Sequence, residues 1–183
     1  SVAQLQRNVG EYLLSVLSQW QKEPAIILDL GCGTGFFCSA LQRRYPAAQY
    51  VGLDIAQGMV KYARGRGSAN CDWLVADAEA LPLANESVDL VFSSLALQWC
   101  HRPEHLFAEL GRVLRPGGLC VFTTLGPDTL SELRSAWAAV DSHQHVNDFL
   151  PACELVAAAE RISNIDLRLE SKGFRMEYAR VRD

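Results

Sequence analysis

Three glycines at alternate positions follow an acidic residue at the end of an apolar run. Asp29 lies in the run AIILDL, and the next segment carries Gly31, Gly33 and Gly35. Glycine has no Cβ, so a ligand can approach the backbone of such a loop closely. A dinucleotide fingerprint places a third glycine where this chain has Phe36, and the Gly-Lys-Ser/Thr ending of a P-loop is absent. Asp29 would repel a pyrophosphate and favour an ammonium or a sulfonium group.

Two further acids follow later strand-like segments. Asp54 ends VGLD, where a carboxylate can accept hydrogen bonds from both hydroxyls of a ribose and would clash with a 2′-phosphate. Asp77 lies in LVADAEAL and is placed to accept from the exocyclic amine of an adenine, while the backbone amide of Ala78 meets a ring nitrogen. A lone acid of this kind is usually a strand-end cap or a solvated loop residue. Three at successive strand ends predict an adenosyl ligand without phosphate, S-adenosylmethionine.

Strand-like and helix-like segments alternate through most of the chain. Short apolar runs predict strands covered on both faces, at residues 25–30, 49–55, 71–77, 87–96 and 119–125. Apolar residues at helical spacing predict helices, at residues 4–20, 35–45, 56–67, 102–114, 128–140 and 151–162. Such alternation predicts an α/β fold, a Rossmann-like doubly wound and mostly parallel sheet between two layers of helices.

The remaining segments are less regular. RPGG at 115–118 is predicted to be a turn and 142–151 a loop, and Asp128 is the expected cap of its helix. Two further strands are possible, at 165–171 and 174–181. We expect one domain over residues 1–183, with an N-terminal helix (1–24), a cofactor-binding core (25–125) and substrate-side elements (126–183).

Composition excludes several classes of protein. The net charge of −4 argues against a nucleic-acid binder that works through bulk charge. No apolar run approaches the roughly 20 residues of a membrane span, and the N-terminus does not resemble a signal peptide. The six cysteines form no CxxC, so we do not expect a structural zinc site. We expect the cysteines to be buried, reduced thiols. We expect a cytoplasmic monomer that binds neither nucleic acid nor membrane.

The motifs LDLGCGTGFF, ADAEALPLANESVDLVFSS and VLRPGG closely resemble those of class I methyltransferases. The resemblance implies S-adenosylmethionine as cofactor and S-adenosylhomocysteine as product. It implies that the glycines line the methionine end, that Asp54 binds the ribose, and that Asp77 and Ala78 hold the adenine. The full expected cofactor-binding set is Asp29, Gly31, Cys32, Gly33, Gly35, Asp54, Ile55, Asp77, Ala78 and Ser93.

Segments further along the chain resemble one particular family of these methyltransferases. LALQWC (95–100), FTTLGPDTLSELRSAWAAVD (122–141) and HVNDFLP (145–151) resemble the malonyl-[acyl-carrier protein] O-methyltransferases of early biotin synthesis. This resemblance implies methyl transfer to the free carboxylate of a malonyl thioester, on acyl-carrier protein or coenzyme A. A carboxylate with a pKa of about 4 is ionised at neutral pH, so no catalytic acid or base is expected. Members of that family extend further at both ends, and we expect this chain to lack those segments.

The expected substrate-side residues are Gln98, Trp99 and His145. Gln98 is expected to donate a hydrogen bond to the cofactor or the malonyl group, and Trp99 to wall the cleft or, equally, to be plain core. His145 is assigned by family analogy alone. Arg102 and Arg115 are candidates for binding the carboxylate.

The histidines of HRPEH do not follow the H-E-x-x-H order of a zinc site, so no metal is expected.

An acidic carrier protein would dock on a basic surface. The candidate clusters are Lys61, Arg64 and Arg66, and the tail residues Arg168, Lys172, Arg175, Arg180 and Arg182. Ordinary solvated charge explains either cluster equally well.

Three other functions remain open. One is a class I methyltransferase with another small-molecule or protein acceptor. The others are a non-catalytic assembly factor with this fold, and a nicotinamide dehydrogenase.

Overall fold

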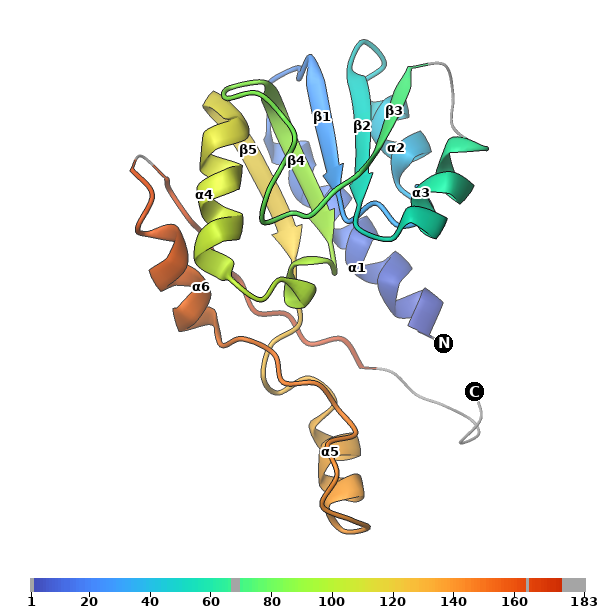
Figure 1. Cartoon of the computed structure of the whole chain (residues 1–183), viewed down its shortest axis with the longest axis vertical. Coiled ribbons are helices and arrows are strands. Elements are labelled where there is room, and N and C mark those ends of the chain that lie inside the picture. The colour runs from blue at the N-terminus through green and yellow to red at the C-terminus, as the bar shows by residue number, and fades with distance from the viewer. Residues whose placement is uncertain (1, 67–69, 164, 176–183) are drawn as a thin grey trace.

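The computed structural model describes residues 2–66, 70–163 and 165–175. Its centre is a five-stranded parallel sheet in the order β3-β2-β1-β4-β5 (Figure 1). The strands are β1 (Ile26–Leu30), β2 (Gln49–Asp54), β3 (Cys71–Val75), β4 (Val88–Ser94) and β5 (Leu114–Thr123). All five predicted strands are confirmed.

Helices cover both faces of the sheet. The longer ones are α1 (Val2–Val16), α2 (Cys38–Arg44), α3 (Gln57–Arg64), α4 (Pro103–Val113), α5 (Ser131–Ala138) and α6 (Ala152–Ala159). Two short 3-10 turns are η1 (Leu17–Gln19) and η2 (Leu97–Trp99). The predicted helices are confirmed, with ends that differ by a few residues. The three-layer doubly wound architecture is confirmed as well.

Alternation along the strands explains the two cores. Ile27, Tyr50 and Phe92 point to one face, where they pack with apolar residues of α1, α2 and α3. Leu28 and Val91 point to the other face and pack with α4 and α6. Because both faces are covered, the strands are continuous apolar runs, as parallel sheets require. The two cores hold the sheet in place from both sides. The loops that follow the carboxyl ends of the strands therefore lie together at one end of the sheet, which we call the carboxyl edge.

The turn predicted at residues 115–118 is wrong in form, since these residues belong to β5. The pairing of β4 with β5 shifts register between Val88 and Leu90, and Gly117 has a φ of 73°. The extra residues therefore bulge out of the ladder instead of reversing the chain. A Pro-Gly-Gly run marks an irregularity but does not distinguish a bulge from a turn.

The cap predicted at Asp128 is also wrong. α5 begins after Leu130, which has a left-handed backbone with a φ of 57°, and no side chain caps this helix. α5 buries none of its residues, and its segment extends away from the sheet on the side of the strands' carboxyl ends (Figure 1).

The strand expected at 165–171 is wrong, since these residues are coil. Leu167 packs on the core beside α4, and the Tyr12 hydroxyl donates to Glu170 at 3.1 Å. The segment is thus held by side chains, without a backbone ladder. In the second expected strand, 174–175 are coil and 176–181 lie outside the described residues.

Within the described residues, no helix combines the length and the hydropathy needed to cross a membrane.

Candidate cofactor site at the carboxyl ends of the strands

The order of the strands defines where a ligand would bind. The chain runs outward from β1 to β2 and β3, then returns to the other side of β1 for β4 and β5 (Figure 1). Ligands of open parallel sheets bind beyond the carboxyl ends at this reversal, between β1 and β4. The glycine loop follows β1, and the segment that contains η2 follows β4. A Cβ added to Gly31 would lie 2.2 Å from the Cβ of Ala96, so these two loops meet there.

The glycine loop is fastened to the end of β2. The amides of Gly31 and Cys32 donate to the Leu53 carbonyl at 2.7 and 3.0 Å. The amide of Gly33 donates to Asp54 Oδ2 at 2.8 Å. A Cβ built on Gly33 would meet nothing within 4 Å, so the space above this residue is open. The structure therefore brings Asp54 and the loop together around an open position.

Gly33 and Gly35 of the loop both have a left-handed backbone conformation, but their surroundings differ. Gly33 has a φ of 53° and open space, whereas Gly35 has a φ of 73° and a virtual Cβ 2.5 Å from the indole of Trp73. We predict that Gly33→Ala lowers the free energy of unfolding by about 1 kcal/mol, the cost of a left-handed backbone. Gly35→Ala adds an overlap with Trp73 and should lower it by about 3 kcal/mol. Urea denaturation measures both, and equal losses would contradict this difference.

Asp29 is a buried carboxyl group on the α1–α3 face of the sheet. It is 2% exposed, and its Oδ2 accepts from the Tyr50 hydroxyl at 2.5 Å. Burial raises the pKa of Asp29 to about 7, against a lowering by the Tyr50 hydrogen bond and with a further rise from Asp54. A carboxyl group with such a pKa gains strongly from a cationic neighbour. Tyr50 was not anticipated from the sequence, where it is one more residue of an apolar run.

The residues predicted to hold the adenine lie at the same end of the sheet. Asp77 is exposed and its Oδ1 accepts from the Glu79 amide at 2.9 Å. Ala78 is half-buried beside it. Ile55 is 71% exposed next to Asp54, and Val75, which pairs with Asp54 across the sheet, is 50% exposed. Apolar side chains left in water beside polar acceptors are typical of a binding site for a flat ring.

Cys32 and Ser93 are buried parts of the edge. The Ser93 hydroxyl donates to the Leu30 carbonyl at 2.8 Å and thus ties β4 to β1. Burial raises the pKa of the Cys32 thiol, so it stays protonated.

In the segment after β4, the side-chain nitrogen of Gln98 is hydrogen-bonded and its side-chain oxygen is not. Leu95 has a positive φ of 53°, a strained conformation for a branched residue. Its carbonyl accepts from Gln98 Nε2 at 2.8 Å, and Gln98 Oε1 is buried without a partner among the described residues. The buried amide oxygen is therefore an acceptor that a ligand could use, and the donor role expected from the sequence stays a prediction. Trp99 is 64% exposed, so the alternative that it is plain core is wrong.

His145 is placed away from the glycine loop. Its ring stacks on Trp137 of α5, with centroids 4.0 Å apart, and its Nε2 lies 2.9 Å from Asp141 Oδ1. These contacts belong to the segment that extends away from the sheet (Figure 1). The structure thus gathers the cofactor residues but does not bring His145 to them.

The candidate arginines are already paired. Arg102 Nε lies 2.8 Å from Glu79 Oε2, and Arg115 Nη1 lies 2.8 Å from Asp89 Oδ2. Asp89 also accepts from the Ile26 amide at 2.9 Å, so Arg115 lies at the amino ends of the strands. Neither side chain is an unpaired cation for a substrate carboxylate, and Arg115 is at the wrong end of the sheet.

Several residues of the basic clusters have local partners. Arg64 donates to the Trp73 carbonyl at 2.8 Å and Arg66 to the Tyr62 hydroxyl at 2.6 Å, whereas Lys172 Nζ lies 3.7 Å from the ring centroid of Tyr12. Arg180 and Arg182 lie outside the described residues. Among the residues that are described, no three His, Cys, Asp or Glu side chains are grouped as a metal would need.

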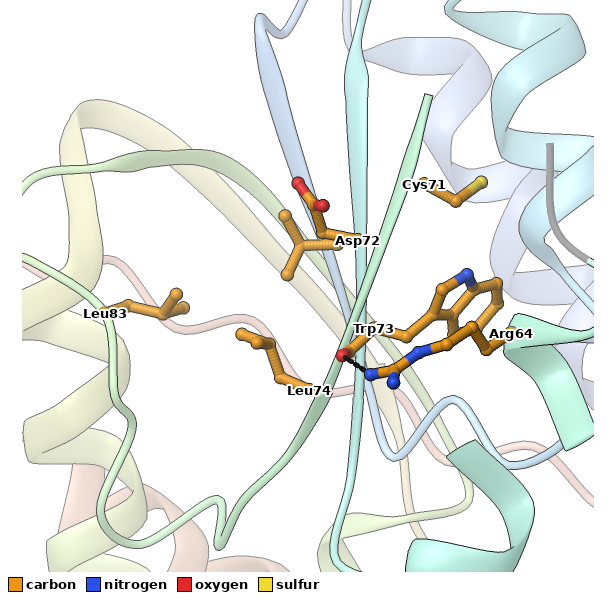
Figure 2. A pocket seen from close by; sticks show the side chains of 7 residues that line it. Arg64, Cys71, Asp72, Trp73, Leu74 and Leu83 are labelled. Carbon is orange, nitrogen blue, oxygen red and sulfur yellow. Dashed lines mark hydrogen bonds between the residues drawn. The ribbon is translucent and has the colours of Figure 1, made fainter. Parts of the chain in front are cut away.

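A depression of about 420 Å³ lies elsewhere, beside the edge strand β3 (Figure 2). Its lining includes Cys71 and Trp73 on one side of the strand and Asp72 and Leu74 on the other, with Arg64 hydrogen-bonded to Trp73. It exists because the connection from β3 to β4 contains no helix to cover this edge. The residues of the glycine loop do not line it, so it is not the predicted cofactor site.

The residues at the carboxyl edge fit S-adenosylmethionine. The open position at Gly33, the exposed apolar pair beside Asp54 and the partnerless acceptor on Gln98 are the features that a ligand would complete. The acids would hold an ammonium and a ribose, and they would repel a phosphate.

Solved structures share this fold. An S-adenosylmethionine-dependent methyltransferase from Mesorhizobium loti superposes with a TM-score of 0.68 at 25% identity, over 86% of this chain and 82% of that one. The [4+2]-cyclase SpnF gives 0.65 at 24% identity, over 83% of this chain and 57% of that one. The fold is the Rossmann-like fold of the class I methyltransferases. SpnF shows that this fold alone does not specify the reaction.

Sequence comparison narrows the class. The model of the methyltransferase domain family matches residues 28–122, and the chain belongs to that family. It is 45% identical, over 98% of its length, to the malonyl-[acyl-carrier protein] O-methyltransferase of Methylococcus capsulatus, and covers 66% of that protein. It is also 45% identical, over its whole length, to the biotin biosynthesis bifunctional protein BioHC of Cellvibrio japonicus, of which it covers 36%. The chain thus spans less than two thirds of the length of these relatives.

Proposed function

We propose that this chain binds S-adenosylmethionine and transfers its methyl group to the free carboxylate of a malonyl thioester on acyl-carrier protein, an early step of biotin synthesis. The observation that carries the proposal is the set of acids at the carboxyl ends of β1, β2 and β3 around a glycine loop with one open position. The names of the relatives supply the acceptor. We also propose that the protein is a cytoplasmic monomer.

The cofactor, when bound, supplies a methyl group activated by a sulfonium sulfur. Asp29 would favour the ammonium end, Asp54 would accept from the ribose hydroxyls, and Asp77 with Ala78 would hold the adenine. The Gln98 acceptor, which lies at the start of the segment after β4, would take a donor from the cofactor or from the amides of the thioester arm. Ile55 and Val75 would cover the ring and exclude water.

The protein needs no general base for this reaction, because the malonyl carboxylate is already ionised at neutral pH. Its task is to align the attacking oxygen with the methyl group in a site from which water is excluded.

The test is transfer of labelled methyl from S-adenosylmethionine to malonyl-carrier protein, with unmodified carrier protein as control. We expect label only on the malonylated form, in a base-labile ester. Label on another acceptor and none on malonyl-carrier protein would refute the acceptor. Cofactor binding with no transfer to any acceptor would favour the non-catalytic alternative.

A further inference from the structure

Two thiols from distant parts of the chain meet beside the sheet. Cys38 is the first residue of α2 and Cys71 the first residue of β3, and their Sγ atoms lie 3.2 Å apart. They are separated by 33 positions in the sequence, and α2 and β3 bring them together on the same face. The cysteine spacing gave no sign of this contact, because the pair is neither a CxxC nor close in the chain.

The two thiols differ in access to solvent. Cys38 is buried, at 6% exposure. Cys71 is half-buried and lines the depression beside β3 (Figure 2). It also lines a smaller depression of about 280 Å³. A small oxidant can therefore reach Cys71 from solvent, but it cannot reach Cys38 in the same way. Partly exposed thiols beside a second thiol are the ones that oxidation selects.

The surrounding structure permits a bond between them. A disulfide needs a sulfur separation of about 2.05 Å, so the two atoms must approach by roughly 1 Å. Within the part of the chain that the structure describes, β3 is an edge strand whose one partner is β2, and Cys71 is its first residue. The end of an edge strand has few contacts to break, so a shift of this size is easier there than in the middle of the sheet.

We propose that Cys38 and Cys71 form an oxidation site, which closes an intramolecular disulfide when a peroxide is the oxidant. The Cys71 sulfur attacks the peroxide, its O–O bond breaks, and Cys71 becomes a sulfenic acid with release of water. Cys38 then attacks that sulfur, the S–O bond breaks, and the oxygen leaves as water with the Cys38 proton. Both sulfurs are oxidised, and one hydrogen peroxide is reduced to two waters.

The environment of Cys38 explains why it is not the first of the two sulfurs to react. Its thiol is 3.7 Å from Gln42 Oε1, which can accept the S–H hydrogen. Burial, and then the contact with Cys71, raises the pKa of Cys38 to about 12. Cys38 is thus protonated at neutral pH and is not the first sulfur to be oxidised, while the 3.2 Å separation of the two sulfurs makes it the partner of an oxidised Cys71.

The disulfide would join the helix after the glycine loop to the edge of the sheet. Cys71 lies at the amino end of β3, opposite the end that carries the predicted cofactor residues. Cys38 lies closer to that site, since its amide donates to the Gly35 carbonyl at 3.1 Å. The oxidation test needs neither cofactor nor acceptor, so its outcome is separate from that of the proposed function.

The test is peptide mapping of the whole chain after hydrogen peroxide treatment and alkylation without reductant. Cleavage by trypsin and chymotrypsin together separates Cys38 from Cys32 at Phe37, and Cys71 from Cys100 at Trp73. We expect a cross-linked pair of peptides that contain Cys38 and Cys71, two hydrogens lighter than their sum. Dithiothreitol should return both to alkylatable thiols.

Two variants serve as matched controls. Cys153→Ser removes an exposed cysteine on α6 and should leave the cross-link unchanged. Cys38→Ser should abolish the cross-link and leave Cys71 as a sulfenic acid that dimedone traps. Cys71→Ser keeps the buried thiol, and its Cys38 should remain unoxidised. Oxidation of Cys71 to the sulfinic acid in the unmodified chain, or cross-links that do not join these two residues, would overturn the proposal.

Discussion

Asp54→Ala is expected to weaken the binding of S-adenosylhomocysteine by about 100-fold or more. Two ribose hydroxyls donating to a charged acceptor contribute about 1.5–3 kcal/mol each, and 1.4 kcal/mol corresponds to a factor of ten. Asp54 also orders the site, since Oδ2 accepts from the Gly33 amide and Oδ1 from the Ala56 amide, each at 2.8 Å. Calorimetric titration measures the loss.

A neighbouring acid provides the control for this experiment. Asp72 lies on β3 with an exposed side chain that accepts from Gln49 at 2.5 Å, away from the carboxyl edge. Asp72→Ala should bind S-adenosylhomocysteine as the unmodified chain does. Unchanged affinity in Asp54→Ala, with the fold intact by circular dichroism, would refute the assignment of the ribose site.

Asp29→Asn is expected to change the pH dependence of stability. The pKa of Asp29 rises from 3.8 in the unfolded chain to about 7 in the folded one. A raised pKa means that the folded state holds its proton more tightly. Its contribution to stability is therefore complete below pH 4 and is lost as the pH rises to about 7. Raising the pH from 5 to 8 should therefore lower the free energy of unfolding by about 3 kcal/mol through the titration of Asp29 alone.

Asp29→Asn has no carboxyl group at this position, so it does not lose this part of the free energy of unfolding as the pH rises. Its oxygen can still accept from Tyr50, whereas its amide nitrogen is a new buried donor that costs about 1–3 kcal/mol at every pH. The difference in stability between variant and unmodified chain should therefore move by about 3 kcal/mol in favour of the variant from pH 5 to pH 8. Urea denaturation at both pH values measures it, with Asp72→Asn as control. A difference that is the same at both pH values would contradict a buried carboxyl group with a raised pKa.

The same substitution should weaken the binding of S-adenosylhomocysteine, because a neutral amide does not attract an ammonium group. A variant more stable at pH 8 yet poorer in binding would show that the buried acid is kept at a cost in stability. Such costs are typical of functional sites.

The elements that could be predicted from the sequence are those set by local patterns. Continuous apolar runs identified all five strands. Asp29, Asp54 and Asp77 lie at or just beyond the carboxyl ends of three of them, which was enough to place these acids at the same end of the sheet. The Gly33 loop could be predicted because a backbone with positive φ favours glycine.

What could not be predicted depends on partners distant in the chain. The hydroxyl of Tyr50 reaches Asp29 only because β1 and β2 are neighbours. Arg102 and Arg115 seemed to be candidates for a carboxylate because their acids, Glu79 and Asp89, are far away in the sequence. The alternating pattern of 165–171 was compatible with a strand, but a strand also needs a partner for its backbone, and a local pattern cannot supply one.

The central claim is that the carboxyl edge of the sheet is an adenosyl site without a phosphate pocket. The most direct measurement is calorimetric titration of the chain with S-adenosylhomocysteine and, separately, with NAD. The account predicts one S-adenosylhomocysteine bound per chain, in competition with S-adenosylmethionine, and no heat from NAD. Binding of NAD, or no binding of S-adenosylhomocysteine to the folded chain, would contradict it.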